Sequence, residues 1–286
     1  MYSNDGLAII ILDYNKPDLT NRCLESIWRY NRVKIVLVNS GSTEYEEYDR
    51  SIPFLYVINH RGRSFSIGMN TGFKAASSLN SKYVIFMNND AILTGEAVRL
   101  LVNALQSNSK LGMVSSGYRY SLGFLNKERS LDLTLHDTDQ PKIRLRKMLT
   151  GFCLCARFEA ISAIGGYDEN FLFTKEDDDL SIRLIKKGYI LGEVENSVVI
   201  HKISSSTNFS EEHEIHFLST SFGIGCGLLV NKKERYLISM LTHLLINDVF
   251  LFIKIIILTQ KFKFDIFKWS LNGFKNGISK NLDSSH

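Results

Sequence analysis

Residues 7–17 read Leu7-Ala8-Ile9-Ile10-Ile11-Leu12-Asp13-Tyr14-Asn15-Lys16-Pro17. The apolar run over 7–12 is short and rich in β-branched residues, which is typical of a buried strand. Pro17 suits the first turn of a helix, and Asn15 lies just before it, where a capping side chain is expected. This segment therefore predicts a buried strand that leads into a helix over about 17–30.

The same alternation continues along the first ninety residues. Further apolar runs at 34–38, 55–58 and 83–87 predict strands, and a helix rich in small residues is expected from about Ser66. Such a β-α-β rhythm predicts a largely parallel sheet with helices on both faces. Beyond residue 90 the pattern predicts helices around 96–106, 158–164 and 176–187, the last ended by Gly188, and strands around 113–116, 151–156 and 198–200.

The composition indicates a folded protein with a substantial core. The chain has 286 residues, of which 44% are hydrophobic and 22% charged, and its net charge of +4 gives no argument for a nucleic-acid partner. Cys23, Cys153, Cys155 and Cys226 lack the paired spacing of a zinc site, so we expect buried thiols in a reducing compartment. No secretory leader is recognised at the N-terminus, and we expect residence on the cytoplasmic side.

Two acidic segments are candidates for chemistry. In Phe171 to Arg183, four adjacent carboxylates (Glu176-Asp177-Asp178-Asp179) carry a concentration of like charge that is costly unless a cation, a ligand or catalysis uses it. In 88–90, Asn88-Asn89-Asp90 follows a predicted strand, and ligands of open α/β sheets collect at the carboxyl ends of strands. We therefore expect Asp90 and Asp177 to share one cleft.

Five ordered segments together carry a resemblance to a known family. They are residues 9–15, 36–43, 59–72, 88–90 and 151–183. They resemble glycosyltransferase family 2, the inverting enzymes of GT-A fold, and in particular its bacterial rhamnosyltransferase-like branch, over roughly residues 6–205. The resemblance implies an α/β fold with a mixed, mostly parallel sheet flanked by helices. It also implies transfer of a sugar from a dTDP- or UDP-sugar to a hydroxyl of a saccharide or lipid-linked saccharide in surface polysaccharide synthesis.

The resemblance also implies a set of residues that bind the nucleotide-sugar donor: Tyr14, Asn15, Asn39, Gly41, Arg61, Gly62, Asn70, Asn89 and Glu176. Asn39 stands where the family usually has an acidic residue, which its amide replaces only in part. Arg63 is a second departure and would add a phosphate contact. The alternatives are structural, with Asn15 as a helix cap and the glycines as ordinary turn residues.

For the chemistry, the resemblance implies that Asp177 is the catalytic base. It also implies that Asp90, Asn88 and His201 hold Mg²⁺ or Mn²⁺, although the D-x-D metal motif is matched only at its last position. The structural alternatives stay open: an Asn-Asp turn at the strand end, a core or surface histidine, and Glu176 and Asp178 complementing the helix dipole. For Asp179 and Arg183 we favour an ion pair at i, i+4 spacing.

The C-terminal part differs in character. We expect a glycosyltransferase domain over 1–210 and a helical extension over 211–286. The apolar run at 237–258 is interrupted by His243, Asn247, Asp248 and Lys254, which favours a helix lying in the membrane plane over a spanning one. Lysines and aromatic residues interleave in 260–269, which suits anionic headgroups at the inner membrane face. The alternative is a hairpin packed on the protein or on a second subunit, as in a homodimer.

Two other classes of function are alternatives for this sequence. A dinucleotide-dependent oxidoreductase would require a G-x-G-x-x-G turn after the first strand, and residues 13–17 do not provide one. The alternative of a non-catalytic saccharide-binding or scaffold protein of the same fold stays open because acidic residues are lost at Asn39 and Asn88.

Overall fold

The structure is a computed structural model of the chain. It describes residues 2–41, 43–121, 140–149, 151–202, 211–233, 235, 237–259 and 265–280. Contacts divide the chain into two compact units, which are described separately. Unit 1 comprises Met1–Arg63, Ile67–Tyr167 and Leu180–Ser206, and unit 2 comprises Ser64–Ser66, Asp168–Asp179 and Thr207–His286. The functional division expected at residue 210 stays a prediction.

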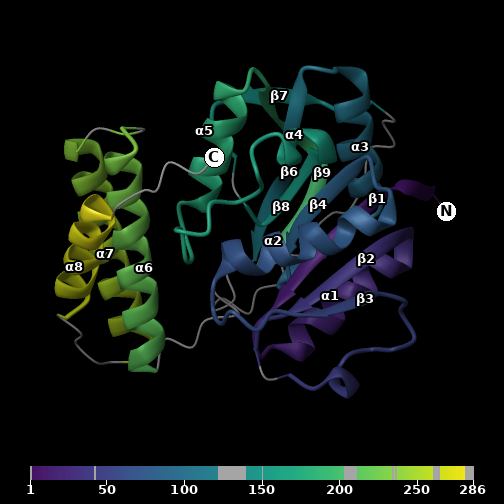
Figure 1. Cartoon of the computed structure of the whole chain (residues 1–286). Coiled ribbons are helices and arrows are strands. Elements are labelled where there is room, and N and C mark those ends of the chain that lie inside the picture. The colour runs from purple at the N-terminus through teal and green to yellow at the C-terminus, as the bar shows by residue number, and fades with distance from the viewer. Residues whose placement is uncertain are drawn as a thin grey trace. The chain divides into compact units, whose positions relative to one another are not determined.

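Unit 1 is built on one sheet of nine strands, seen in purple to green in Figure 1. The strands are β1 (Tyr2–Asp13), β2 (Asn31–Asn39), β3 (Leu55–Ile58), β4 (Tyr83–Asn88), β5 (Ala91–Leu93), β6 (Leu111–Ser121), β7 (Ile143–Arg146), β8 (Cys153–Arg157) and β9 (Ile190–Lys202). The helices that follow them are α1 (Pro17–Tyr30), α2 (Phe65–Ala76), α3 (Ala97–Ser107), α4 (Phe158–Ser162) and α5 (Glu176–Lys186), with 3₁₀ turns at Tyr45–Glu47 and Ser77–Leu79.

The strand order is β3-β2-β1-β4-β8-β6-β9-β5, with β7 beside β9. The first four strands run parallel, whereas β8 lies antiparallel to both β4 and β6. Because parallel strands end at the same edge, the carboxyl ends of β1, β2, β3 and β4 form one border of the sheet. The observed fold confirms the predicted mixed α/β class.

Helices cover both faces of this sheet, as the sequence predicts. Ile9 and Ile11 of β1 belong to a core cluster that also contains residues of α1 and α3. The opposite face carries α2, whose Gly72 packs so closely that a Cβ there would lie 2.8 Å from Cγ2 of Val38. Successive residues of β1 therefore point into two different cores, and the strand is apolar on both faces.

Unit 2 contains three long helices besides residues 168–179. They are α6 (Glu212–Asn231), α7 (Leu237–Thr259) and α8 (Asp265–Ser279), drawn in green and yellow in Figure 1. Added Cβ atoms show how closely α6 and α8 pack: at Gly223 one would lie 2.8 Å from the Phe274 nitrogen, and at Gly277 one would lie 2.9 Å from the Leu228 nitrogen. Such contacts need glycine, because any side chain would push the two backbones apart.

The two close-packed helices run in the same direction. The glycine at 273 faces Thr220, and the glycine at 277 faces Ile224, so positions advance together along α6 and α8. The intervening α7 returns the chain to the start of α8.

Helix α7 agrees with the helix expected over 237–258. Its buried side includes Met240, Leu244 and Asp248. Burial raises the pKa of Asp248 to about 6, although hydrogen bonds from Ser270 and Asn247 oppose this rise. In the described part of the chain, no helix has the length and apolar character needed to cross a membrane. Residues 260–264 of the basic aromatic segment, and residues 122–139, which precede β7, lie outside the described residues.

Candidate functional site

A buried carboxylate organises the sheet border at the end of β1. Asp13 is fully buried and accepts hydrogen bonds from the hydroxyls of Thr20 (2.6 Å), Thr43 (2.9 Å) and Tyr48 (3.0 Å). It also accepts from the Asn89 amide at 3.1 Å, which ties the end of β1 to the end of β4. The several donors satisfy a charge that would otherwise be costly to bury. Asp13 therefore fixes the loops of the border relative to one another.

Tyr48 and Asn89 both donate hydrogen bonds to the Asp13 carboxylate. Burial and the neighbouring Asp13 charge raise the pKa of Tyr48, so its phenol stays protonated and donates. The Asn89 amide nitrogen also donates to Thr20 at 3.1 Å. Both hydrogens of this predicted donor-binding residue are thus used inside the border, and its amide oxygen is the atom left for a ligand.

Asn39, the predicted base-binding residue at the end of β2, shapes its own turn. Its amide nitrogen donates to the Thr43 carbonyl (2.6 Å) and the Tyr56 hydroxyl (2.9 Å). Its amide oxygen accepts from the Gly41 backbone N–H at 2.9 Å. The Asn39 side chain therefore closes the loop after β2 through its own hydrogen bonds.

The loops after β1 and β2 touch at Gly41. A Cβ on this residue would lie 2.8 Å from Cγ of Asn15, so glycine is required for the close approach. Asn15 itself has a φ of 55°, and α1 begins at Pro17, so Asn15 lies one residue outside the capping position expected for it. The Asp13 carboxylate accepts from the Lys16 N–H instead, at 3.2 Å.

The loop after β3 is held by Asn59. This buried residue donates to the Ser40 hydroxyl at 2.8 Å and the Gly62 carbonyl at 3.2 Å, and it accepts from the Arg61 N–H at 3.1 Å. Gly62 has a φ of 83°, a conformation that favours glycine. Arg61 is exposed beyond this turn, where its guanidinium can meet an anion.

An exposed aromatic side chain lies at the same border. Tyr14 is 37% exposed, and the guanidinium carbon of Arg63 lies 4.7 Å from its ring centroid. This cation–π contact aligns an arginine with an aromatic surface of the kind on which a nucleobase stacks. Arg63, for which a phosphate contact is expected, therefore has a structural partner in Tyr14.

The structure brings together two of the three predicted metal ligands. The Nε2 atom of His201 lies 3.1 Å from Oδ1 of Asp90. The antiparallel pairing of β5 with β9 is responsible, because it sets Ala91, which follows Asp90, directly opposite His201. The Phe152 ring stacks on the imidazole with centroids 5.2 Å apart, which fixes the orientation of the ring.

This pair fits a small divalent cation. Adjacent ligands of an octahedral ion with bonds of about 2.1 Å lie about 3 Å apart, close to the observed separation. Asn88, the third predicted ligand, is the last residue of β4 and half-buried, and an amide oxygen is a suitable ligand for such an ion. Among the described residues, no three His, Cys, Asp or Glu side chains gather into a metal cluster. An ion held here would therefore take most of its ligands from phosphate oxygens and water.

The four cysteines are free and buried, as expected. Cys23 lies beneath the predicted metal site, where its thiol donates to the Asn88 carbonyl at 3.7 Å. Burial, followed by the Asp90 charge, raises the pKa of this thiol well above its usual value. The group thus stays neutral and is unsuited to act as a metal thiolate.

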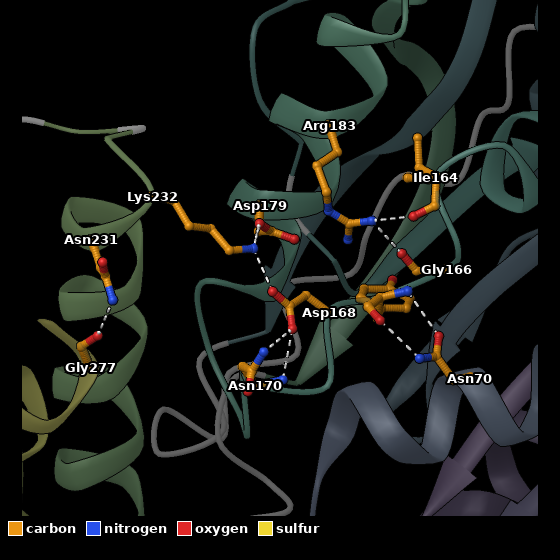
Figure 2. A network of polar contacts seen from close by, with 11 residues as sticks. Asn70, Ile164, Gly166, Asp168, Asn170, Asp179, Arg183, Asn231, Lys232 and Gly277 are labelled. Carbon is orange, nitrogen blue, oxygen red and sulfur yellow. Dashed lines mark hydrogen bonds and ion pairs between the residues drawn. The ribbon is translucent and has the colours of Figure 1, made fainter. Parts of the chain in front are cut away.

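Asn70, predicted to bind the donor, clamps a turn of unit 1. Its amide donates to the Tyr167 carbonyl (2.9 Å) and accepts from the Tyr167 N–H (2.8 Å). Arg183 donates to the carbonyls of Ile164 (2.8 Å) and Gly166 (2.7 Å) in the same turn, as Figure 2 shows. The structure thus gives Arg183 carbonyl partners, and its i, i+4 pairing with Asp179 stays a prediction.

The acidic segment lies in unit 2 and continues into α5. We call residues 168–179 the acid loop. Burial raises the pKa of Glu176 to about 7, the N–H groups of Glu176 and Thr174 oppose the rise, and the Asp178 charge adds to it. Asp178 pairs with Lys175 at 3.2 Å. Asp177 is half-buried in the first helical turn, where the helix dipole stabilises a carboxylate.

Two consecutive residues before α5 adopt an unusual backbone conformation. Thr174 has a φ of 103° and Lys175 a φ of 66°, and neither is glycine. Positive φ is costly for a β-branched residue and persists only where surrounding contacts hold it, often at functional sites. The strain therefore lies immediately before Glu176 and Asp177.

The predicted site residues divide between the two units. Unit 1 gathers most of the donor-binding residues and the Asp90–His201 pair, and unit 2 carries Glu176 and Asp177. The cleft expected between Asp90 and Asp177 stays a prediction. Sequence reasoning missed Asp13, although an acid at the end of an apolar strand was a visible signal. It also missed Lys232, for which no local signal exists.

Comparisons with known proteins agree with this architecture. A 68-residue segment is 37% identical to N-acetylglucosaminyl-diphospho-decaprenol L-rhamnosyltransferase of Mycobacterium tuberculosis, covering 24% of this chain and 22% of that protein. A 122-residue segment is 24% identical to poly-beta-1,6-N-acetyl-D-glucosamine synthase of Staphylococcus epidermidis, covering 40% and 29% of the two chains. The chain thus spans less than a third of these relatives.

Solved structures show the same fold at low sequence identity. A mannosyltransferase from Pyrobaculum calidifontis in complex with GDP-Man and Mn²⁺ superposes with a TM-score of 0.57 at 12% identity, covering 97% of this chain and 76% of that one. GalNAc-T7 with UDP, GalNAc and Mn²⁺ gives a TM-score of 0.56 at 13% identity, covering 75% and 50%.

The model of the family described as glycosyl transferase family 2 matches residues 8–165, from the first strand to the turn that Asn70 clamps. Since this match covers more than half of the sequence, the chain belongs to glycosyl transferase family 2.

Proposed function

We propose that the protein is an inverting glycosyltransferase that moves a sugar from a nucleotide diphosphate to a hydroxyl of a saccharide. The observation that carries this proposal is the Asp90–His201 pair, 3.1 Å apart, in which Asp90 lies just after β4 and within the matched family region. A nucleotide diphosphate needs a cation near its phosphates and a loop border for its base. Unit 1 offers both.

Within this proposal the chain's own residues have distinct roles. Tyr14 and Asn15 contact the base or ribose, with the Asn39 and Gly41 turn beside them. Arg61 and Arg63, next to Gly62, offer donors to the phosphates, and Asn70 and Asn89 hold the surrounding backbone. Asp177 takes the proton of the acceptor hydroxyl as its oxygen attacks the anomeric carbon from the side opposite the diphosphate, and Glu176 assists in binding the donor.

A divalent ion, Mg²⁺ or Mn²⁺, would be held by Asp90, His201 and Asn88. When bound, it supplies charge stabilisation to the departing diphosphate. Support comes from the fit of the ligand pair and from two solved relatives of the same fold that contain Mn²⁺.

The metal role of Asp90 predicts a specific loss. Asp90→Asn is expected to weaken Mn²⁺ binding, measured by calorimetry, and to lower the transfer rate about 100-fold, because one charged ligand is replaced by a neutral one. Asp18→Asn, at an exposed position of α1, serves as the control and is expected to match wild type. Unchanged Mn²⁺ affinity in Asp90→Asn would contradict the assignment.

For substrates, we propose a dTDP- or UDP-sugar as donor and a lipid-linked saccharide as acceptor, in bacterial surface polysaccharide synthesis. The support is the similarity to a decaprenol-linked rhamnosyltransferase and a poly-N-acetylglucosamine synthase. A second candidate, a non-catalytic saccharide-binding protein, is favoured by Asn39 and Asn88. Donor hydrolysis with dTDP-rhamnose and UDP-N-acetylglucosamine, with and without Mn²⁺, separates the two, because a scaffold hydrolyses neither.

We further propose that α7 docks on the cytoplasmic face of the cell membrane. One side of this helix exposes large apolar residues: Ile238, Leu241, Leu245, Ile246, Val249, Phe250 and Ile253. Asp248, which interrupts the apolar run in the sequence, is only 2% exposed and points into the helix group. The exposed apolar side of α7 therefore carries no acidic residue. On α8, Lys268 and Lys275 are exposed and can contact anionic headgroups.

Vesicle binding tests this docking. Ile246→Glu and Phe250→Glu are each expected to lower partitioning onto anionic phosphatidylglycerol vesicles at least about tenfold. Each substitution removes an apolar side chain that would be buried in the lipid and places a charge there. Leu145→Glu, at an exposed apolar position of β7, is the matched control. If Phe250→Glu instead dissociates a dimer in sedimentation and leaves vesicle binding intact, the apolar side is a subunit interface.

A further inference from the structure

A single lysine joins the two ends of the acid loop. Lys232 follows the last residue of α6, and its Nζ donates to Oδ1 of Asp179 at 2.7 Å and to Oδ2 of Asp168. The side chains of Asp168 and Asp179 are 8% and 1% exposed, and that of Lys232 is 17% exposed. Figure 2 shows the ammonium group between the two carboxylates. Two carboxylates buried this closely need the cation that they share.

Each carboxylate fixes one end of the loop. Asp168 accepts from the Asn170 N–H (2.9 Å) and the Asn170 side chain (2.8 Å), which closes a turn. Burial alone would raise the pKa of Asp168, but the hydrogen bond from Lys232 and those from Asn170 hold it below its usual value. Asp179 lies in the first turn of α5, two residues after Asp177. Lys232 therefore brackets Glu176 and Asp177 from both sides.

Helix α6 also packs against Thr174 and Lys175, the residues of the acid loop with positive φ. A Cβ on Gly225 would lie 2.8 Å from the Thr174 carbonyl, so this glycine lets the loop pack against the helix. The Lys175 ammonium lies 5.4 Å from the Phe222 ring centroid, and Phe173 packs on Phe217 with centroids 5.9 Å apart. The same helix that supplies these contacts ends at Asn231, directly before Lys232.

The end of α6 is anchored in turn to α8. Asn231, the residue before Lys232, donates to the carbonyls of Gly277 (3.3 Å) and Lys280 (2.8 Å) at the end of α8. The Lys232 ammonium also lies 5.1 Å from the Phe171 ring centroid, inside the loop. The lysine is thus held on a packed helix pair, which restricts where its charge can move.

We propose that Lys232 is a positioning residue for Asp177: it fixes the acid loop in the conformation that transfer requires, without taking part in the chemistry. This inference rests on the proposed function. Lys232 lies outside the segment matched by the family, so the helical extension completes a catalytic element that the family region alone does not contain.

The test compares Lys232→Met, Lys232→Gln and Lys232→Arg with Lys233→Met, an exposed neighbour used as the control. In Lys232→Met we expect kcat to fall about 50-fold with the donor KM within about threefold of wild type, because geometry is lost and donor binding is not. Lys232→Arg is expected to restore kcat to within about fivefold, since it keeps the charge. Lys232→Gln, which keeps a donor without charge and is the milder change if Met folds poorly, should resemble Met.

Two readouts separate positioning from general stability. Without the cation, neighbouring carboxylates bind protons more tightly, so the acidic limb of the kcat profile should move to higher pH in Met and Gln but not in Arg. Hydrogen exchange, measured without substrate, should show about tenfold faster exchange in 168–179 and no change in 7–12.

Unchanged exchange in 168–179, or faster exchange with an unaltered kcat, would overturn the inference. If wild type transfers no sugar from any donor, the proposed function fails, and the exchange result by itself still decides whether Lys232 orders the acid loop.

Discussion

Replacing Asp177 with asparagine is expected to lower the rate of sugar transfer about 1,000-fold, because a neutral amide cannot take the proton of the acceptor hydroxyl. Donor affinity, measured by calorimetry with Mn²⁺ present, should stay within about threefold of wild type, since the base acts in the transition state and not on the bound donor. Asparagine has nearly the same size and shape as aspartate, so it fits the half-buried position of Asp177 in the first turn of α5.

The adjacent acid provides the control. Asp178 pairs with Lys175 at 3.2 Å, and Asp178→Asn is expected to change the rate at most about fivefold, as for other partly exposed pairs. The two substitutions are chemically identical and lie one residue apart, so a loss confined to position 177 identifies the base. Near-full transfer by Asp177→Asn with a matched donor and acceptor would remove Asp177 from the mechanism.

The second large effect concerns the packing of α6 on α8. On an open helix, Gly277→Ala would stabilise by about 1 kcal/mol through helix propensity. Here the added Cβ would lie 2.9 Å from the Leu228 nitrogen and 3.0 Å from Cα of Gly227. We therefore expect the sign to reverse, with a net loss of about 2 kcal/mol in the free energy of unfolding, because the two backbones must separate.

The measurement can be confined to unit 2. Of the two tryptophans, Trp269 lies in α8 and Trp28 in α1, so in a Trp28→Phe background the fluorescence reports on the helices alone. Asn276→Ala, at the exposed position beside Gly277, is the control and should be neutral or slightly stabilising. A higher urea midpoint for Gly277→Ala would show that the close packing is absent in solution.

The elements that could be predicted are those whose pattern of apolar residues lies within a single segment of the sequence. Helix α1 begins at Pro17 and ends at Tyr30 as expected, and β1 to β4 follow the apolar runs. β5 has three residues and β7 reads Ile143-Arg144-Leu145-Arg146, too short and too polar for a strand signal. Both exist because β9 offers backbone partners, which is a tertiary effect that a local pattern does not contain.

The candidate site shows the same limit. Asp90 was visible as an acid at a strand end, but its contact with His201 depends on the register of β5 with β9. Asn39, Asn70 and Asn89 were expected to bind the donor, and the structure shows that their amides hold loops. An asparagine near a ligand and one that closes a turn look alike in sequence, because the same amide serves both purposes.

The sequence of the helical extension also contains a pattern of small residues that overall composition does not reveal. Thr220, Gly223 and Gly227 in α6 share their spacing with Ser270, Gly273 and Gly277 in α8, and these are the positions where the two helices meet. Spacing alone gives small residues at one helix face, but it does not say which two helices pair.

The pairing of α6 with α8 sets an order of assembly. During synthesis, α8 emerges more than eighty residues after Asp177, so the segment that carries the proposed base leaves the ribosome long before its support exists. Asn231, which precedes Lys232, can form its hydrogen bonds to the end of α8 only after α8 has been synthesised. Catalytic competence would therefore depend on a helix that is synthesised well after the residues that it helps to position.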